Sequence, residues 1–114
     1  MLKIYHNTRC RKSREGLQIL EESGKDFEVR EYLKENLSEK EIADLLQKLN
    51  MAPIELVRKE EKLWKENYRD RDLSDAELIR VMAENPKLVQ RPIVETDNKA
   101  VIGRPASNIE ELLD

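Results

Sequence analysis

The sequence has only one cysteine, Cys10, and only one histidine, His6. A single cysteine excludes a disulfide within the chain. It also excludes the cysteine-rich zinc sites, which need several ligands at set spacings. With a single histidine as well, we expect no metal site. Any thiol redox reaction of this protein therefore requires a second thiol that another molecule supplies.

Long apolar runs are also absent. No run approaches the roughly 18 residues that cross a bilayer, and the first ten residues show no signal-peptide pattern. Apolar and charged residues each make up 39% of the 114 residues. Because Ile, Leu and Val recur in short periodic blocks, the chain does not have the signature of disorder. We therefore expect one domain over residues 1–114, soluble and cytoplasmic, that makes no contact with a membrane.

The periodicity of the apolar residues predicts a β-α-β unit, a helical middle and a β-β-α unit. Alternation predicts strands over residues 2–6 and 27–31. The helix between them is expected to begin near residues 11–13 and to end at Gly24, since glycine commonly follows the last helical turn. A second pair of apolar runs, separated by the turn residues 97–98, predicts a β-hairpin. Strands separated by helices in this way predict a layered α/β domain.

Capping boxes predict three further helix N-termini. The pairs are Ser38 with Glu41, Ser74 with Glu77, and Ser107 with Glu110. The first pair opens a helical insertion of approximately residues 38–85, in which Pro53 and residues 61–68 are expected in short helices. The third pair is expected to start a C-terminal helix.

Positive charge gathers around the only thiol, although the formal net charge of the protein is -3. Four cations flank Cys10: Arg9, Arg11, Lys12 and Arg14. The predicted helix begins directly after Cys10, so the thiol faces unpaired backbone N–H groups and the positive end of the helix dipole. The hydroxyl of Ser13, one turn on, is expected to donate a hydrogen bond to the thiol. We therefore predict a lowered thiol pKa and a reactive thiolate.

Less specific interpretations exist for each of these features. A lone cysteine is more often a small apolar filler, and a basic cluster is more often a solvated helix face. The polar surroundings of Cys10 argue against a filler, and a sequence pI near 5.4 argues against nucleic-acid binding. Alone, His6 at a strand end is a structural residue. Arg58, Arg91 and Arg104 are surface ion-pair residues unless the fold brings them together.

Four motifs in order give the chain a resemblance, from end to end, to the glutaredoxin-linked, thioredoxin-fold arsenate reductases (the ArsC/Spx-like superfamily). They are Y-H-N with C-x-x-S-R at residues 5–14, L-x-R-K at 56–59, Q-R-P-I-V at 90–94, and R-P at 104–105. The resemblance implies a thioredoxin-like fold, with a mixed four-stranded sheet and a helical insertion between its two halves. It also implies that Pro92 is a cis-proline that faces the cysteine loop.

The same resemblance implies a site and a reaction. Cys10 would be the nucleophile, with His6 and Ser13 as its catalytic partners. The substrate arsenate would be bound by Arg58, Arg91 and Arg104. The Cys10 thiolate would attack arsenic, glutathione or another small thiol would resolve the adduct, and glutaredoxin would reduce the mixed disulfide as arsenite leaves. Glutathione is then a co-substrate, with no bound cofactor or metal, and we expect a monomer without a nucleic-acid partner.

Two other functions fit the same superfamily. One is a monothiol thiol-disulfide oxidoreductase, although such an enzyme has no need of three arginines around an oxyanion. The other is an Spx-type regulator that binds RNA polymerase, although those regulators generally carry C-x-x-C where this chain has Ser13. Residues 11–12 are Arg-Lys, whereas some relatives have Gly-Thr there, so the sequence leaves the identity of the thiol donor open.

Overall fold

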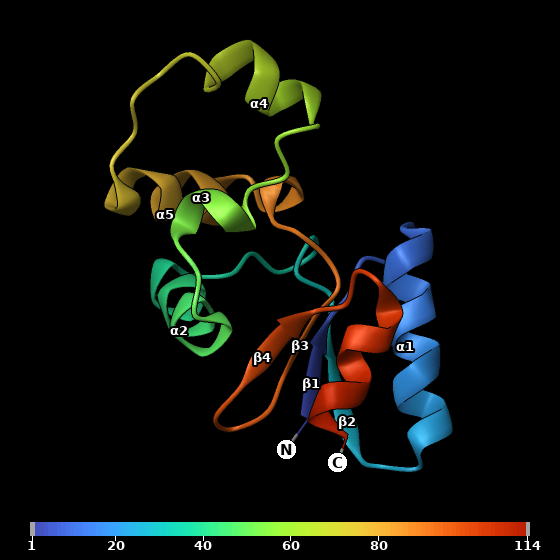
Figure 1. Cartoon of the computed structure of the whole chain (residues 1–114). Coiled ribbons are helices and arrows are strands. Elements are labelled where there is room, and N and C mark those ends of the chain that lie inside the picture. The colour runs from blue at the N-terminus through green and yellow to red at the C-terminus, as the bar shows by residue number, and fades with distance from the viewer. Residues whose placement is uncertain (1, 114) are drawn as a thin grey trace. The chain divides into compact units, whose positions relative to one another are not determined.

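The computed structural model describes residues 2–113, which form two compact units. One unit, the sheet unit, combines the chain up to Glu35 with the chain from Arg91 onward. The other, the helical unit, contains residues 36–90 and so extends beyond both ends of the insertion expected at residues 38–85. Figure 1 follows the chain through both units.

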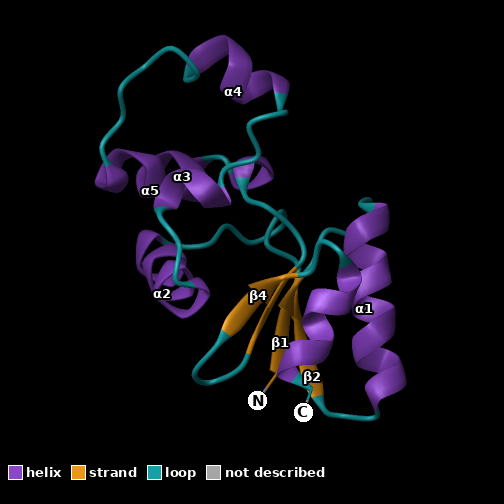
Figure 2. Cartoon of the chain, in the orientation of Figure 1, coloured by secondary structure: helices purple, strands orange, loops and turns teal. Residues whose placement is uncertain are grey.

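The sheet unit contains a mixed four-stranded sheet in the order β2-β1-β3-β4 (Figure 2). The strands are β1 (Leu2–Tyr5), β2 (Phe27–Arg30), β3 (Ile93–Glu95) and β4 (Ala100–Ile102). β1 runs parallel to β2 and antiparallel to β3, and β3 and β4 form the predicted hairpin. The predicted β-α-β and β-β order around a mixed sheet is therefore confirmed.

Two helical segments cover one face of this sheet, α1 (Arg11–Ser23) and the 3₁₀ helix η2 (Ala106–Leu112) (Figure 1). The amphipathic pattern of α1 directs Leu20 into the core that the sheet and η2 share. α1 ends where predicted, at Gly24, whose φ of 75° lies in the left-handed region that favours glycine. The buried core residues of this layer are Leu2, Ile4, Leu20, Val94 and Ile109.

Pro92 packs between two glycines at the centre of the sheet unit. A Cβ atom on either Gly16 or Gly103 would lie 2.9 Å from Cγ of Pro92 and no more than 3.0 Å from Cδ1 of Ile109. Only glycine therefore leaves room for this packing. The Arg91–Pro92 bond is cis, as the resemblance implied, and the Arg104–Pro105 bond is also cis, which it did not imply.

The predicted capping box at Ser107 is wrong. The C-terminal segment begins as a 3₁₀ helix at Ala106, directly after Pro105, so Ser107 lies inside the helix and not at its N-cap. Two sets of contacts accompany this start: the side-chain amide of Asn108 donates to the nearby carbonyls of Ile102 and Arg104, and Ile109 is fully buried against Gly103 and the distant Gly16. This tertiary anchoring overrides the local signal.

The helical unit contains five helical segments. They are α2 (Glu39–Leu49), α3 (Pro53–Leu56), α4 (Lys62–Asn67), α5 (Asp75–Glu84) and the 3₁₀ helix η1 (Pro86–Leu88). The capping boxes at Ser38 and Ser74 are both formed, as predicted. α2 and α3 pack against α5, and Val57 pairs with Val89 in an isolated β-bridge. Within residues 2–113, no helix has the length and apolar character needed to span a bilayer.

Candidate active site

Cys10 is the N-cap residue of α1, with an extended backbone (φ -98°, ψ 121°). Its carbonyl accepts the first helical hydrogen bond, from the N–H of Arg14 at 3.0 Å. The side chain is partly exposed. The thiol therefore lies where the sequence predicted, at the positive end of a helix of 13 residues.

Asn7 organises the loop that presents Cys10. Its carbonyl accepts the Cys10 N–H at 3.0 Å, and its side-chain oxygen accepts the N–H of Arg9 at 3.0 Å. The guanidinium of Arg14 reaches back from α1 and donates to the Thr8 carbonyl at 3.0 Å. Both residues belong to the motifs at residues 5–14, but from the sequence Arg14 was expected only to add positive charge, and Asn7 had no assigned role. An asparagine that begins a tight turn before a helix was the available signal.

Ser13 joins this loop to His6. Its hydroxyl accepts the N–H of Asn7 at 2.9 Å and lies 2.7 Å from Nδ1 of His6. The expected hydroxyl hydrogen bond to Cys10 is therefore not what this side chain forms; the backbone of Ser13 is the part that supports the thiolate. Ser13 is fully buried, so these two contacts of its hydroxyl are shielded from water.

His6 is buried, with only 4% of its surface exposed. Burial lowers the pKa of His6, the carboxylate of Glu31 opposes this effect, and the positive charge of Arg14 reinforces it. The net direction is downward, so the imidazole is neutral at pH 7. The neutral ring shares a hydrogen bond with the Ser13 hydroxyl at Nδ1, and the direction of this bond depends on the tautomer of the ring. His6 therefore contributes a hydrogen bond to Ser13 and no positive charge.

Two arginines from the far end of the chain lie at the thiol. Nη2 of Arg104 donates to Sγ of Cys10 at 3.6 Å, while its Nε donates to the carbonyl of Arg91 at 2.9 Å. The side chain of Arg91 also donates a hydrogen bond to the thiolate. Each arginine precedes a cis-proline, so the backbone turns sharply after both. The sheet unit thus brings two of the three predicted substrate-binding arginines to Cys10.

These contacts change the chemistry of the thiol. Partial burial raises the pKa of Cys10, but hydrogen bonds from Arg91, the Ser13 backbone and Arg104, with the charge of Arg91, more than offset this effect. They lower the pKa to about 7, from an ordinary value of 9.0. About half of the molecules therefore carry a thiolate at neutral pH.

Arg58, the third predicted arginine, belongs to the helical unit. It is largely buried, and its guanidinium pairs with two glutamates: Nη1 lies 2.9 Å from Glu61 and Nε lies 3.3 Å from Glu60. Its backbone N–H donates to the carbonyl of Leu88 at 2.7 Å. These contacts hold both the side chain and the backbone of Arg58 in place within the helical unit.

The described residues, 2–113, contain no group of three or more His, Cys, Asp or Glu side chains that could hold a metal ion. The chemical groups at the site are instead one nucleophile and two cations. Guanidinium groups form paired hydrogen bonds with oxyanions, and a thiolate is a strong nucleophile.

Comparison with known proteins gives consistent matches over nearly the whole chain. Residues 5–112 match the model of the ArsC family. The uncharacterized protein YfgD of Escherichia coli K12 is 46% identical over 98% of this chain and 96% of its own length. An arsenate reductase of Neisseria meningitidis serogroup A is 41% identical, over 98% of this chain and 97% of its own.

A solved structure, an arsenate reductase from Vibrio cholerae, matches with a TM-score of 0.91 at 42% identity. The match covers 96% of this chain and 95% of that one. Together with the strand order β2-β1-β3-β4, it confirms the predicted α/β, thioredoxin-like fold.

Proposed function

The chain belongs to the ArsC family, and on that basis we propose that it is an arsenate reductase with Cys10 as its nucleophile. The observation that carries the proposal is the thiol itself: its pKa is lowered to about 7, and Arg91 and Arg104 donate hydrogen bonds to it. A thiolate flanked by two guanidinium groups is suited to attack an oxyanion.

The two arginines reduce the repulsion between the thiolate and arsenate in the first step. Arsenate and a thiolate are both anions, so they repel each other as they approach. Guanidinium groups bind oxyanions through paired hydrogen bonds and stabilise negative charge as it develops. Sγ of Cys10 attacks arsenic, a Cys–S–As bond forms, and one oxygen of arsenate leaves as water or hydroxide. The same two cations thus serve both the nucleophile and the substrate.

The second step needs an external thiol, because the chain has no second cysteine. We assign this role to glutathione. Its sulfur attacks Sγ of Cys10, and the electron pair of the S–As bond stays with arsenic, which is reduced from As(V) to As(III) and leaves as arsenite. The mixed disulfide between Cys10 and glutathione is then reduced by glutaredoxin, which returns Cys10 to the thiolate.

Other residues support these steps. We assign to His6 and Ser13 the positioning of the cysteine loop, since the Ser13 hydroxyl ties the loop to the His6 ring. We assign to Arg58 a contact with arsenate on the basis of its L-x-R-K motif. Its ion pairs with Glu60 and Glu61 then have to be exchanged, at least in part, for the oxyanion.

The test is arsenate-dependent oxidation of NADPH in the presence of glutathione, glutaredoxin and glutathione reductase. The wild-type protein is expected to be active and Cys10→Ser inactive. Arg11→Gln is a matched control, because Arg11 is exposed and pairs with Glu15 at 3.4 Å, so its loss is expected to leave the rate unchanged. A wild-type protein whose thiol has the low pKa but which consumes no NADPH would refute the proposed function.

One observation also favours a second function, that of a monothiol thiol-disulfide oxidoreductase. Cys10 is partly exposed and carries a low-pKa thiol, which is what attack on a glutathionylated protein requires. The two functions differ in their need for Arg104. Reduction of a glutathione mixed disulfide should tolerate Arg104→Lys, which keeps the charge, whereas bidentate binding of arsenate should not.

A further inference from the structure

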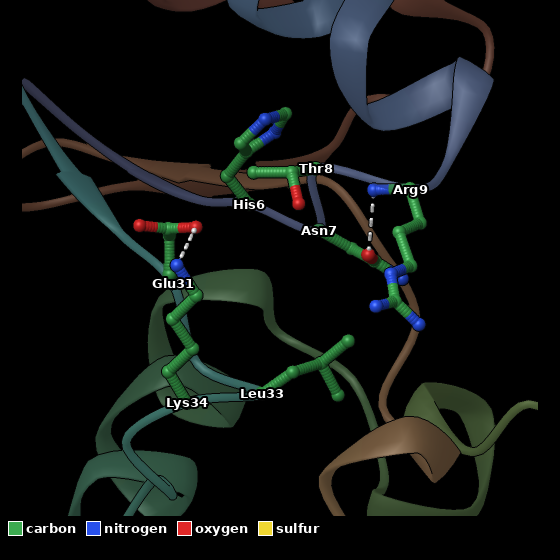
Figure 3. A pocket seen from close by; sticks show the side chains of 7 residues that line it. All are labelled: His6, Asn7, Thr8, Arg9, Glu31, Leu33 and Lys34. Carbon is green, nitrogen blue, oxygen red and sulfur yellow. Dashed lines mark hydrogen bonds and ion pairs between the residues drawn. The ribbon is translucent and has the colours of Figure 1, made fainter.

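A pocket of about 230 Å³ lies beside the cysteine loop and within the sheet unit (Figure 3). It is lined by His6, Asn7, Thr8, Arg9, Glu31, Leu33 and Lys34. Two loops form it: the one after β1 and the one after β2. Since these strands are parallel, with Tyr5 opposite Arg30, the two loops leave the sheet at the same edge. The pocket is therefore a direct product of the β-α-β topology.

Arg9 is the cation of the cysteine loop that is available to a ligand. Arg11 and Lys12 both pair with Glu15, and the guanidinium of Arg14 is bound to the Thr8 carbonyl. No carboxylate within residues 2–113 forms an ion pair with Arg9, whose side chain is exposed and extends along one side of the pocket in Figure 3.

The opposite side of the pocket carries charges of both signs. Lys34 Nζ lies 3.3 Å from the Glu31 carboxylate, and both side chains are reached by solvent. Leu33, between them in sequence, is 39% exposed, which is unusual for a large apolar side chain in this protein. The lining thus presents two cations, one anion and an apolar surface.

We propose that this pocket binds glutathione, the thiol co-substrate, by its charged ends. The inference rests on the proposed function, because that reaction requires an external thiol. At neutral pH glutathione carries two carboxylates and one ammonium group, the inverse of the two cations and one anion of the lining. Arg9 binds one carboxylate. The ion pair between Lys34 and Glu31 opens, so that Lys34 binds the second carboxylate and Glu31 binds the ammonium, while Leu33 contacts the central part of the tripeptide.

The location suits delivery of the sulfur. Arg9 lines the pocket and is the neighbour of Cys10, and consecutive Cα atoms are only about 3.8 Å apart. A tripeptide anchored at its two ends holds its central cysteine away from the charged contacts. The bound tripeptide therefore lies beside the loop that carries the nucleophile. The two arginines at the thiol, Arg91 and Arg104, remain for the oxyanion.

The experiment is titration with S-methylglutathione, which has the same charged groups but cannot form a disulfide. Amide NMR shifts are followed in wild type, in Arg9→Gln and in the control Arg11→Gln. The largest shifts are expected at Thr8, Arg9, Leu33 and Lys34. Because one hydrogen bond to a charged group is lost, binding by Arg9→Gln is expected to weaken by about tenfold, and binding by Arg11→Gln to stay as in wild type.

Because the titration uses no arsenate, it separates the two proposals. Saturable binding that depends on Arg9, together with no arsenate turnover, would leave this inference standing and remove the proposed function. Arsenate turnover that depends on Cys10, together with equal binding by wild type and Arg9→Gln, would leave the function and overturn the pocket assignment. Shifts confined to other parts of the chain, or no saturable binding by wild type, would also overturn it.

Discussion

Replacing Arg104 by glutamine is expected to raise the pKa of the Cys10 thiol and to slow its reaction with electrophiles at neutral pH. Nη2 of Arg104 lies 3.6 Å from Sγ, so the arginine stabilises the thiolate by a hydrogen bond from a charged donor. Its Nε also holds the carbonyl of Arg91 at 2.9 Å, which keeps the second arginine in place. Glutamine removes the charge and leaves a shorter, neutral amide.

The size of the effect follows from the geometry. A nearby opposite charge lowers a pKa by about 1 to 3, and the partial exposure of Cys10 places Arg104 at the lower end of that range. The pKa of the variant is therefore expected to be about 8, against about 7 in the wild type. At pH 7 the thiolate fraction then falls from about one half to about one tenth, so that alkylation slows by about fivefold.

The assay is the rate of alkylation by iodoacetamide, a neutral reagent, over a pH series that spans both pKa values. At high pH, where both thiols are ionised, the variant should react as fast as the wild type or slightly faster, because a more basic thiolate is more nucleophilic. Arg11→Gln is the control and should keep the wild-type midpoint. A midpoint that stays in place in Arg104→Gln, or that moves equally in Arg11→Gln, would refute the role of this contact.

Three further predictions concern stability, each measured as the free energy of unfolding in denaturant. Gly16→Ala should cost about 1 to 3 kcal/mol, because the new Cβ would lie 2.9 Å from Cγ of Pro92; an unchanged value would contradict the tight packing. Ser38→Ala should lower the free energy of unfolding by about 1 kcal/mol, whereas Ser107→Ala, outside any N-cap, should change it by less than about 0.5 kcal/mol. Equal losses in the two variants would indicate that Ser107 does cap a helix. Since folding lowers the pKa of Cys10 from 9.0 to about 7, the contribution of Cys10 to stability should rise with pH across that window and be constant below it. Cys10→Ser should abolish the rise, and a fall in wild-type stability over the same window would show that the sign is wrong.

The helix ends that were predicted correctly from the sequence are those with local signals. Ser38 and Ser74 each bond to a backbone N–H three residues on, and Gly24 adopts a left-handed conformation within its own turn. At Ser107 the same local pattern is present, but Ile109 packs against residues far away in sequence and sets the start of the helix. A local pattern does not contain that information.

In the candidate site, too, the features that depend on local sequence were predicted from it, and those that depend on long-range contacts were not. The position of Cys10 at a helix N-terminus follows from the change of period after the first strand. The meeting of Cys10 with Arg104, 94 residues away, does not follow from any spacing and was expected only through the family resemblance. The Ser13 hydroxyl was assigned to the wrong partner, since only the folded loop shows that Asn7 and His6 lie closer to it. The pocket at residues 31–34 was missed because it depends on the pairing of β1 with β2.

The separation between Cys10 and Arg104 has a consequence for synthesis of the protein. Translation at about 5–20 residues per second takes on the order of 5–20 s to cover that interval. Throughout this time the emerging cysteine lacks both arginines that favour its thiolate, Arg91 and Arg104. A nascent or truncated chain therefore has a Cys10 thiol whose pKa is closer to the ordinary value. Such a thiol is oxidised less readily and binds metal ions less readily. Cys10 becomes a strong nucleophile only after the C-terminal part of the chain has been synthesised and has folded against the N-terminal part.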